Sequence, residues 1–224
     1  MVRSHTQPTH PHHHGLLPTQ RDRTVVDPLA TGRVRAFDLP TVAAWLWSAT
    51  ADPRENARRR LGELVAAGLL KRLQVIACPL PPVQAPVFSW QPGERAPDCG
   101  ALAWQLQTRW AKPRITRIYL AGSGVAFRFG LPADGLKNPT TVSHDLHMGA
   151  IYAHFACTKP QKLLDWMGED QAPPVAVINK RPDAVLVRHG KPYRVIESGG
   201  AYPRERVAAF HEACERSRIP YELW

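Results

Sequence analysis

Two carboxylates flank a short hairpin in the segment KRPDAVLVRHGKPYRVIESGG, residues 180–200. Asp183 stands at the start of one apolar run, and Glu197 ends the next one. A hairpin would bring both side chains to the same end of a sheet, where their oxygens could hold Mg²⁺. Such an ion polarises a phosphodiester and activates the attacking water, and many metal-dependent DNA-cutting enzymes space their carboxylates in this way. His144 or Asp145, on a preceding helix, would complete the cluster.

The lysine that such enzymes carry two residues after the glutamate is missing from this segment. Gly199 occupies that position, between Ser198 and Gly200. The lysine would stabilise charge on the nucleophile and the phosphate. Substitute cations could come from Lys180, Lys191, Arg204 or Arg206. Two interpretations follow: an endonuclease that uses Asp183 and Glu197, or a catalytically degenerate site in which Asp183 caps a strand turn and Glu197 pairs with an arginine.

The elements that must position this cluster are expected in the order helix, strands, helix, strand. Residues 140–156 predict an amphipathic helix. The runs AVLVR and YRVIES flank HGKP, which predicts a tight hairpin centred on Gly190. Residues 202–218 predict a second helix, and IPYELW predicts a final strand. This order is that of the restriction-endonuclease-like α/β fold, which we assign to residues 140–224.

A second candidate region is an arginine-rich helix near the N-terminus. Asp52 suits the N-cap, Pro53 the first turn and Glu55 the reciprocal bond of a capping box. The inward stripe is expected to consist of Leu61, Leu64, Val65 and Leu69, and Gly68 suits the helix terminator. Strands predicted at 70–77 and 86–90 would form a hairpin after it. Helices followed by a hairpin are typical of a winged helix-turn-helix domain, which we assign to residues 23–95.

The arginines of this helix lie off its apolar stripe and give it a basic face. Such a face can enter the major groove of DNA while the hairpin touches phosphates. The predicted DNA-binding residues are Arg54, Asn56, Arg58, Arg59 and Arg60 on the helix, and Lys71 and Arg72 on the first strand. The alternative is a solvated face on a winged helix that binds another protein.

The remaining segments are less informative. Residues 1–22 are rich in His and Pro and predict a disordered tail whose histidines form no functional metal site. Residues 96–139 predict a connecting helical segment, in which Trp104 and Trp110 are expected to be packing residues. With the two assigned domains, the expected fold class is α/β (α+β): an N-terminal winged helix-turn-helix followed by a restriction-endonuclease-like domain.

The net charge and the distribution of apolar residues indicate which kinds of partner to expect. A net charge of +10 with a pI near 9.9 favours a polyanion, and here double-stranded DNA. No run approaches the roughly 18 apolar residues of a membrane span. The four cysteines are scattered without a zinc-like pair. We therefore expect a cytoplasmic protein associated with the nucleoid or a plasmid, with no membrane partner, no metal site of its own and no cofactor except Mg²⁺ in the endonuclease alternative.

Several motifs together resemble those of the replication-relaxation family. They are HDL (144–146), Trp166 with Glu169, RPDAVL (181–186) and the strand that ends in Glu197 before a helix. The resemblance covers residues 24–224 and implies a DNA-binding accessory protein of plasmid or mobile-element replication, transfer or mobilisation, with other replication or mobilisation proteins as partners. Family members often follow the glutamate with Asp and an Arg-Gly pair, whereas this chain has ESGGAY, as in a divergent member.

Other functions stay open beside this one. They are a Mg²⁺-dependent DNA endonuclease, a transcriptional regulator and a protein-assembly module that holds a partner on the nuclease-like domain. A homodimer is open as well, because winged helices often pair to occupy two half-sites, although no heptad pattern marks an interface.

Overall fold

The structure is a computed structural model that describes residues 16–79, 83–128, 130, 141–172 and 181–224. Over these residues the chain is a mixed α/β protein with seven α-helices and two β-sheets. Across the same ranges, no helix combines the length and the apolarity that a bilayer span requires. Most of the predicted tail, together with its histidine run, lies outside the described residues.

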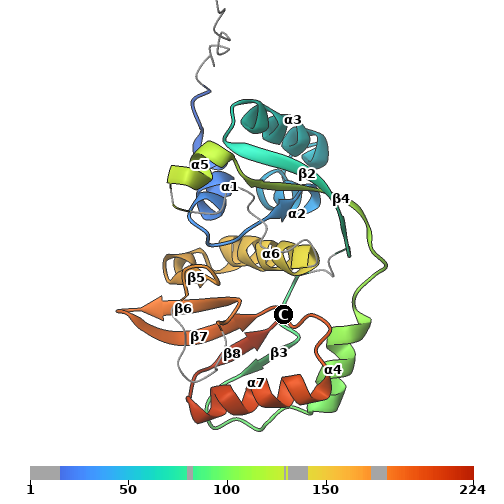
Figure 1. The fold of residues 1–224 in the computed structure, drawn as a ribbon, viewed down its shortest axis with the longest axis vertical. Helices are drawn as coiled ribbons and strands as arrows, with labels where there is room; N and C mark the ends of the chain where they lie inside the picture. The colour runs from blue at the N-terminus through green and yellow to red at the C-terminus, as the bar shows by residue number, and fades with distance from the viewer. Residues whose placement is uncertain (1–15, 80–82, 129, 131–140, 173–180) are drawn as a thin grey trace, which may run out of the picture.

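The first sheet and its helices form the upper part of Figure 1. They are α1 (Gln20–Ala30), β1 (Phe37–Asp38), α2 (Leu39–Leu46), α3 (Pro53–Ala66), β2 (Leu70–Ala77), β4 (Arg114–Ala121) and α5 (Ser123–Arg128). The sheet order is β1-β4-β2, with both pairs antiparallel. The predicted start and end of α3 are confirmed, because the Asp52 carboxylate accepts from the Glu55 N–H at 3.0 Å and Gly68 has a φ of 73°. The Glu55 carboxylate, however, bonds to Arg58, so the reciprocal half of the capping box gives way to an ion pair.

The predicted hairpin between residues 70–77 and 86–90 is wrong. β2 pairs along its whole length with β4, which lies in the segment predicted to be a helical connection. β3 (Phe88–Trp90) pairs instead with β8 (Tyr221–Leu223) in the second sheet, where the buried Trp90 ring stacks on Tyr221 at 5.7 Å. The chain therefore leaves the first sheet after β2, supplies β3 and α4 (Cys99–Thr108) to the lower part, and returns as β4 (Figure 1). The predicted boundary at residue 95 does not separate the two sheets.

The second sheet has the strand order β3-β8-β7-β6-β5. Its remaining members are β5 (Trp166–Gly168), β6 (Ala184–Arg188) and β7 (Lys191–Glu197). The predicted β6–β7 hairpin is confirmed, and its turn residues His189 and Gly190 both have positive φ, as two-residue hairpins require. β7 and β8 are parallel and are joined by α7 (Arg204–Arg216), whose inward residues Val207, Phe210 and Cys214 are buried with α4 on one face of the sheet.

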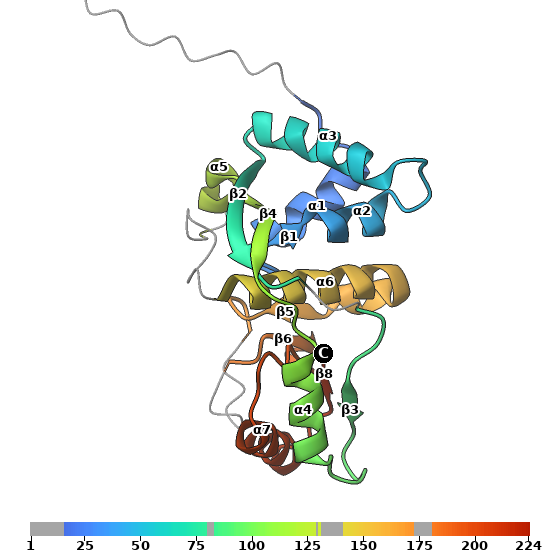
Figure 2. The ribbon, with the colours of Figure 1, turned by 90° about the vertical axis from the view of Figure 1, so that its right-hand side faces the viewer.

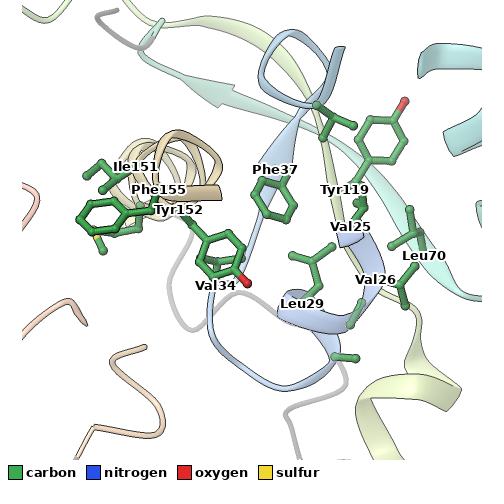
Figure 3. Close-up of a cluster of buried hydrophobic side chains, with 14 of the residues drawn as sticks. Val25, Val26, Leu29, Val34, Phe37, Leu70, Tyr119, Ile151, Tyr152 and Phe155 are labelled. Carbon is green, nitrogen blue, oxygen red and sulfur yellow. The ribbon is translucent and has the colours of Figure 1, made fainter. Parts of the chain in front are cut away.

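α6 (Val142–Thr158) lies between the two sheets and holds the molecule together (Figure 2). The helix predicted here is confirmed, but the prediction that it is amphipathic is wrong, because α6 is buried on most of its surface. Its residues Ile151, Tyr152 and Phe155 share one core with α1, β1 and β4, as Figure 3 shows, and also with β6, β7 and Trp224. A Cβ atom at Gly149 would stand 2.2 Å from the Ala36 carbonyl oxygen, so the close approach of α6 to β1 requires glycine. The 3-10 helix η2 (Pro160–Leu164) then leads to β5.

The predicted tail ends earlier than residue 22. Thr19 and Asp22 form a capping box in which each side chain accepts from the other residue's backbone N–H, and this starts α1. Asp22 is 1% exposed, because it also binds Arg60 of α3. Residues 19–22 are therefore the N-cap and first turn of α1, and Asp22 links that turn to α3.

Candidate functional site

The predicted pair of carboxylates does meet at one end of the second sheet. The Asp183 N–H donates to Glu197 Oε2 at 3.3 Å, and the Ser198 N–H donates to Asp183 Oδ2 at 2.9 Å. This follows from the β6–β7 register, which places Ala184 opposite Ile196. Both carboxylates are buried, with 7% of Asp183 and 1% of Glu197 exposed. The structure thus brings together the two acidic residues predicted from their spacing.

His144 on α6 joins this pair. Its Nε2 atom lies 2.9 Å from Asp183 Oδ2, and its Nδ1 atom lies 3.6 Å from Asp145 Oδ1. Burial alone would lower the pKa of His144, but the hydrogen bonds with Asp145 and Asp183 outweigh it and raise that pKa to about 10. At neutral pH an imidazolium therefore stands between the two aspartates.

Asp145 was predicted as a candidate to complete the cluster of Asp183 and Glu197, but its carboxylate binds Arg35 instead. Its Oδ1 atom accepts from Arg35 Nη1 at 3.1 Å, and the same guanidinium binds Glu169 and Asp170 at 2.7 and 2.9 Å. Burial opposes the charge of Arg35, but the hydrogen bond with Asp170 and the nearby carboxylates raise its pKa. Asp145 is therefore part of an arginine-centred cluster next to the Asp183–Glu197 pair.

Tyr202 closes the other side of Glu197. The Tyr202 hydroxyl donates to Glu197 Oε1, and Arg206 Nη2 donates to the same hydroxyl at 3.1 Å. The Arg206 guanidinium also lies 3.9 Å from the centre of the Tyr202 ring. Burial and the charge of Glu197 raise the pKa of Tyr202. Glu197 was predicted to pair with an arginine, and in the structure the Tyr202 hydroxyl lies between Glu197 and Arg206. Because Tyr202 is uncharged, no pattern of charged residues in the sequence marks it as part of the site.

The place of the absent lysine is occupied by α4. A Cβ atom at Gly199 would stand 2.6 Å from Leu106 Cδ2, so α4 packs where a longer side chain would begin. Among the proposed substitutes, Arg206 reaches the cluster through Tyr202, whereas Lys191 is exposed at the opposite end of β7 and Arg204 is exposed at the start of α7. Lys180 lies outside the described residues.

Ser198 is bonded to a second histidine of α6. Its Oγ atom lies 2.8 Å from His147 Nδ1, and the rings of Trp110 and His147 form a T-shaped contact with centres 5.3 Å apart. Burial lowers the pKa of His147 to about 3, so this imidazole is neutral. Trp110 is thus a packing residue as predicted, while the prediction for Trp104 is wrong because 67% of that residue is exposed on α4.

The carboxylates of Asp183 and Glu197 are the groups that the endonuclease alternative requires as Mg²⁺ ligands. Among the described residues, however, no group of three or more His, Cys, Asp or Glu side chains is arranged to hold a metal ion. Both carboxylates accept hydrogen bonds from protein donors, namely the Ser198 N–H, His144, the Asp183 N–H and the Tyr202 hydroxyl. Binding Mg²⁺ therefore requires that some of these bonds be exchanged.

The predicted DNA-binding residues of α3 fall into two groups. Arg54, Arg58 and Arg59 are exposed; Arg58 pairs with Glu55 at 2.5 Å, and Arg59 donates to Asn56 Oδ1 at 3.3 Å. Asn56 is half-buried, and its amide also donates to Thr50 Oγ1 at 3.1 Å.

Arg60 points toward α1. It binds Asp22 at 2.6 Å and Glu63 at 2.5 Å, and the hydrogen bond from Arg60 lowers the pKa of Asp22 to about 2. Because the pair ties α3 to α1, Arg60 has a structural contact that the sequence did not reveal.

Among the basic residues of the strands, Arg72 and Arg117 lie close to those of α3. Arg72 on β2 stands opposite Tyr119 on β4. Burial raises the pKa of Tyr119, while the charges of Arg117, Arg72 and Arg58 act in the opposite direction. All three guanidiniums are thus within electrostatic range of one hydroxyl. Lys71, the neighbour of Arg72, is half-buried and points to the opposite face of the sheet, so the structure does not bring it together with Arg72 and the α3 arginines.

Arg114 and Arg117 on β4 were not among the residues predicted from the sequence; Arg117 lies on the same face of the sheet as Arg72, and Arg114 lies on the other face. The alternation in RITRIY is the pattern that predicts a strand with these residues on it, but the glycines that follow it left helix and strand open.

Comparison with known proteins adds no assignment to this geometry: no family model, no curated protein and no solved structure matches the chain.

Proposed function

We propose that the chain is a DNA-binding accessory protein of plasmid or mobile-element replication, transfer or mobilisation. In this proposal the upper half is a winged helix that binds double-stranded DNA, and the lower half is a nuclease-like domain that has lost its reaction. A role in transcriptional regulation or in the assembly of other proteins would use the same DNA-binding surface. The observation that carries the proposal is the exposed arginine face of α3, formed by Arg54, Arg58 and Arg59, with the exposed Arg72 on the adjoining strand β2.

The order of elements supports a winged helix. In winged helices three helices precede a hairpin, and a short strand between the first two helices pairs with the returning strand. Here β1 lies between α1 and α2, and β4 is the returning strand, because the sheet order is β1-β4-β2. The loop that usually joins the two strands of the wing is replaced by the segment that carries β3 and α4.

The exposed charges support DNA as the partner. Arg54, Arg58 and Arg59 occupy the outer side of α3, and the exposed Arg72 of β2 continues the charge onto the sheet. A helix that enters the major groove, flanked by strand arginines on the phosphates, requires this arrangement. Release of counterions from the phosphates would then drive binding.

The test is duplex binding by the full-length chain in a gel shift at a stated salt concentration. The double variant Arg58→Ala plus Arg59→Ala is expected to lose the shifted band and to keep its circular dichroism spectrum. The control variant, Arg95→Ala plus Arg216→Ala, removes the same charge from exposed positions in the lower half and is expected to bind like the parent. Unchanged duplex affinity in the α3 variant would contradict the proposal.

One observation favours a second function, a Mg²⁺-dependent endonuclease. The order α6-β5-β6-β7-α7-β8, with β7 parallel to β8, is compatible with the restriction-endonuclease-like core expected from the sequence, and Asp183 and Glu197 meet at one end of this sheet. This function predicts cleavage of DNA with Mg²⁺ or Mn²⁺ that disappears in Asp183→Asn. If supercoiled, branched and single-stranded DNA all stay intact with both ions, the nuclease-like domain has a structural or assembly role.

A further inference from the structure

A groove of about 850 Å³ lies beside the proposed DNA-binding helix. Its walls are α2, the ends of β2 and β4 where the chain leaves and re-enters the first sheet, and the second half of α6. Figure 1 shows β2 and β4 descending past α2 toward α6. The groove exists because β2 and β4 are not closed by a tight hairpin turn at this end.

Three arginines line this groove. Arg54 comes from the first turn of α3, and Arg114 and Arg117 come from β4. Within the described part of the chain none of the three makes an ion pair, in contrast to Arg58 and Arg60 of α3. The acidic residue of the lining is Asp38, which is 9% exposed and whose carboxylate accepts from the Thr41 N–H at 2.9 Å as the cap of α2. The groove is therefore electropositive and complementary to phosphate.

Most of the other residues in the lining are apolar, which favours a ligand that has apolar groups as well as negative charge. The half-buried Trp45 lies in the lining and is held in place by Phe37 and Tyr152, whose ring centres are 5.6 and 6.2 Å from that of Trp45. Ile115 is 74% exposed at the rim and pairs across the strands with Ile76, which is 72% exposed. Single-stranded nucleic acid combines phosphates with sugars and bases that seek such apolar and aromatic surfaces.

The size of the groove suits a single strand better than a duplex. The volume lies within the range of about 300–1,000 Å³ that is usual for small-ligand sites, so the groove admits a few nucleotides and not a double helix. The exposed arginines of α3, in contrast, stand on a convex helix suited to a duplex. Arg54 belongs to both surfaces, and a strand in the groove would be continuous with DNA bound on α3.

We infer that this groove binds a short single-stranded DNA segment, with its phosphates on Arg54, Arg114 and Arg117 and its sugars and bases against Trp45 and Ile115. The inference rests on the proposed DNA-binding function and deepens it. α3 holds a duplex, and the groove holds an unpaired strand beside it. Such a junction of paired and unpaired DNA occurs wherever a replicating or transferring element is opened.

The test measures two ligands separately. A fluorescently labelled oligothymidylate and a labelled duplex are each titrated with the full-length chain and its variants, and anisotropy is recorded over a series of salt concentrations. Arg114→Ala plus Arg117→Ala is expected to weaken oligothymidylate binding on the order of tenfold. The same variant should make the slope of log K against log salt less steep by about 0.7 for each phosphate that is no longer neutralised. Ile115→Glu, at an exposed position, should weaken it as well without removing an arginine. The matched control is Arg95→Ala plus Arg216→Ala.

The outcomes are distinguishable from those of the proposed function. Oligothymidylate affinity that is unchanged in Arg114→Ala plus Arg117→Ala overturns the inference, as does an equal loss for the oligothymidylate and the duplex, which would make the groove part of the duplex surface. A loss confined to the single strand supports it. Arg58→Ala plus Arg59→Ala tests duplex binding alone. If this variant binds the duplex with unchanged affinity, the proposed function is refuted. The oligothymidylate titrations would still decide whether the groove binds a single strand. Thermal unfolding of each variant confirms that it is folded.

Discussion

Gly199 lies so close to Leu106 that a Cβ atom at residue 199 would stand 2.6 Å from the Leu106 Cδ2 atom and 2.9 Å from Cδ1. Leu106 is fully buried on α4, which belongs to the segment inserted between β2 and β4. The helix α4 therefore fills the space into which a longer side chain at residue 199 would extend. The glycine at residue 199 and the packing of α4 against it therefore depend on each other.

The first prediction concerns this contact. Gly199→Ala should lower the free energy of unfolding by about 1–3 kcal/mol, because the added methyl overpacks a buried site. Gly200→Ala is the control, since nothing lies within 4 Å of a Cβ atom there, and it should change stability by less than about 0.5 kcal/mol. Urea denaturation followed by fluorescence measures both. In a double-mutant cycle, Leu106→Ala should remove most of the cost of Gly199→Ala. Additive losses would show that the two residues do not compete for space.

The second prediction concerns the ion pair between Asp22 and Arg60. Its hydrogen bond lowers the pKa of Asp22 to about 2 in the folded chain, below the value of about 3.9 expected when the chain is unfolded. The pair therefore contributes its full stabilisation above about pH 4, and the contribution is lost as the pH falls toward 2. Asp22→Asn should cost on the order of 2 kcal/mol at pH 7, and the difference from the parent should shrink between pH 4 and pH 2.

The measurement is urea denaturation at a series of pH values. Asp27→Asn is a matched control, because Asp27 is exposed on the same helix. Equal pH profiles for the parent and Asp22→Asn would show that the ion pair does not stabilise α1 against α3.

The third prediction concerns the buried hydrogen bond from Tyr202 to Glu197. Tyr202→Phe removes the donor and leaves a carboxylate that is 1% exposed with one fewer partner, so it should cost about 1–3 kcal/mol. Tyr193→Phe removes a similar bond to Asp165, at 2.8 Å, but its partner lies nearer the surface and also binds Arg188. Thermal unfolding should therefore show a smaller loss for Tyr193→Phe. A larger loss of thermal stability in Tyr193→Phe than in Tyr202→Phe would show that the buried hydrogen bond to Glu197 is not the more stabilising of the two.

The sequence predicted most of the individual elements because their causes are local. Asp52 as a cap, Gly68 at a positive φ and the His189–Gly190 turn each depend on a few neighbouring residues. The meeting of Asp183 with Glu197 was predictable for the same reason, since a tight hairpin sets the register of the two strands that carry them.

The features that the sequence did not reveal depend on contacts between distant segments. The run at 88–90 has the composition of a strand, but its partner β8 is more than a hundred residues away, and β2 finds β4 only after the inserted segment returns. α6 has little polar surface to mark a face, because it is covered from both sides. Arg60 resembles its neighbours in sequence, and only the packing of α1 on α3 makes Asp22 its partner.

The last prediction separates the residues that would select a DNA sequence from those that would only bind its backbone. Arg72→Ala on β2 should weaken binding to all duplexes by a similar factor and make the salt slope less steep by about 0.9, which is the share of one phosphate that the variant no longer neutralises. Arg59→Ala on α3 should instead change the preference among duplexes, because a side chain on a helix in the major groove contacts base edges.

The two variants are compared by selecting duplexes from a random pool and by titrating chosen duplexes over a range of salt. Arg72 lies on a sheet that flanks the helix, while Arg59 is exposed on the helix itself. If the strand variant changes the selected sequence and Arg59→Ala leaves it unchanged, the strands and not α3 contact the bases. The duplex would then lie across the sheet, and α3 would serve as the phosphate-binding element.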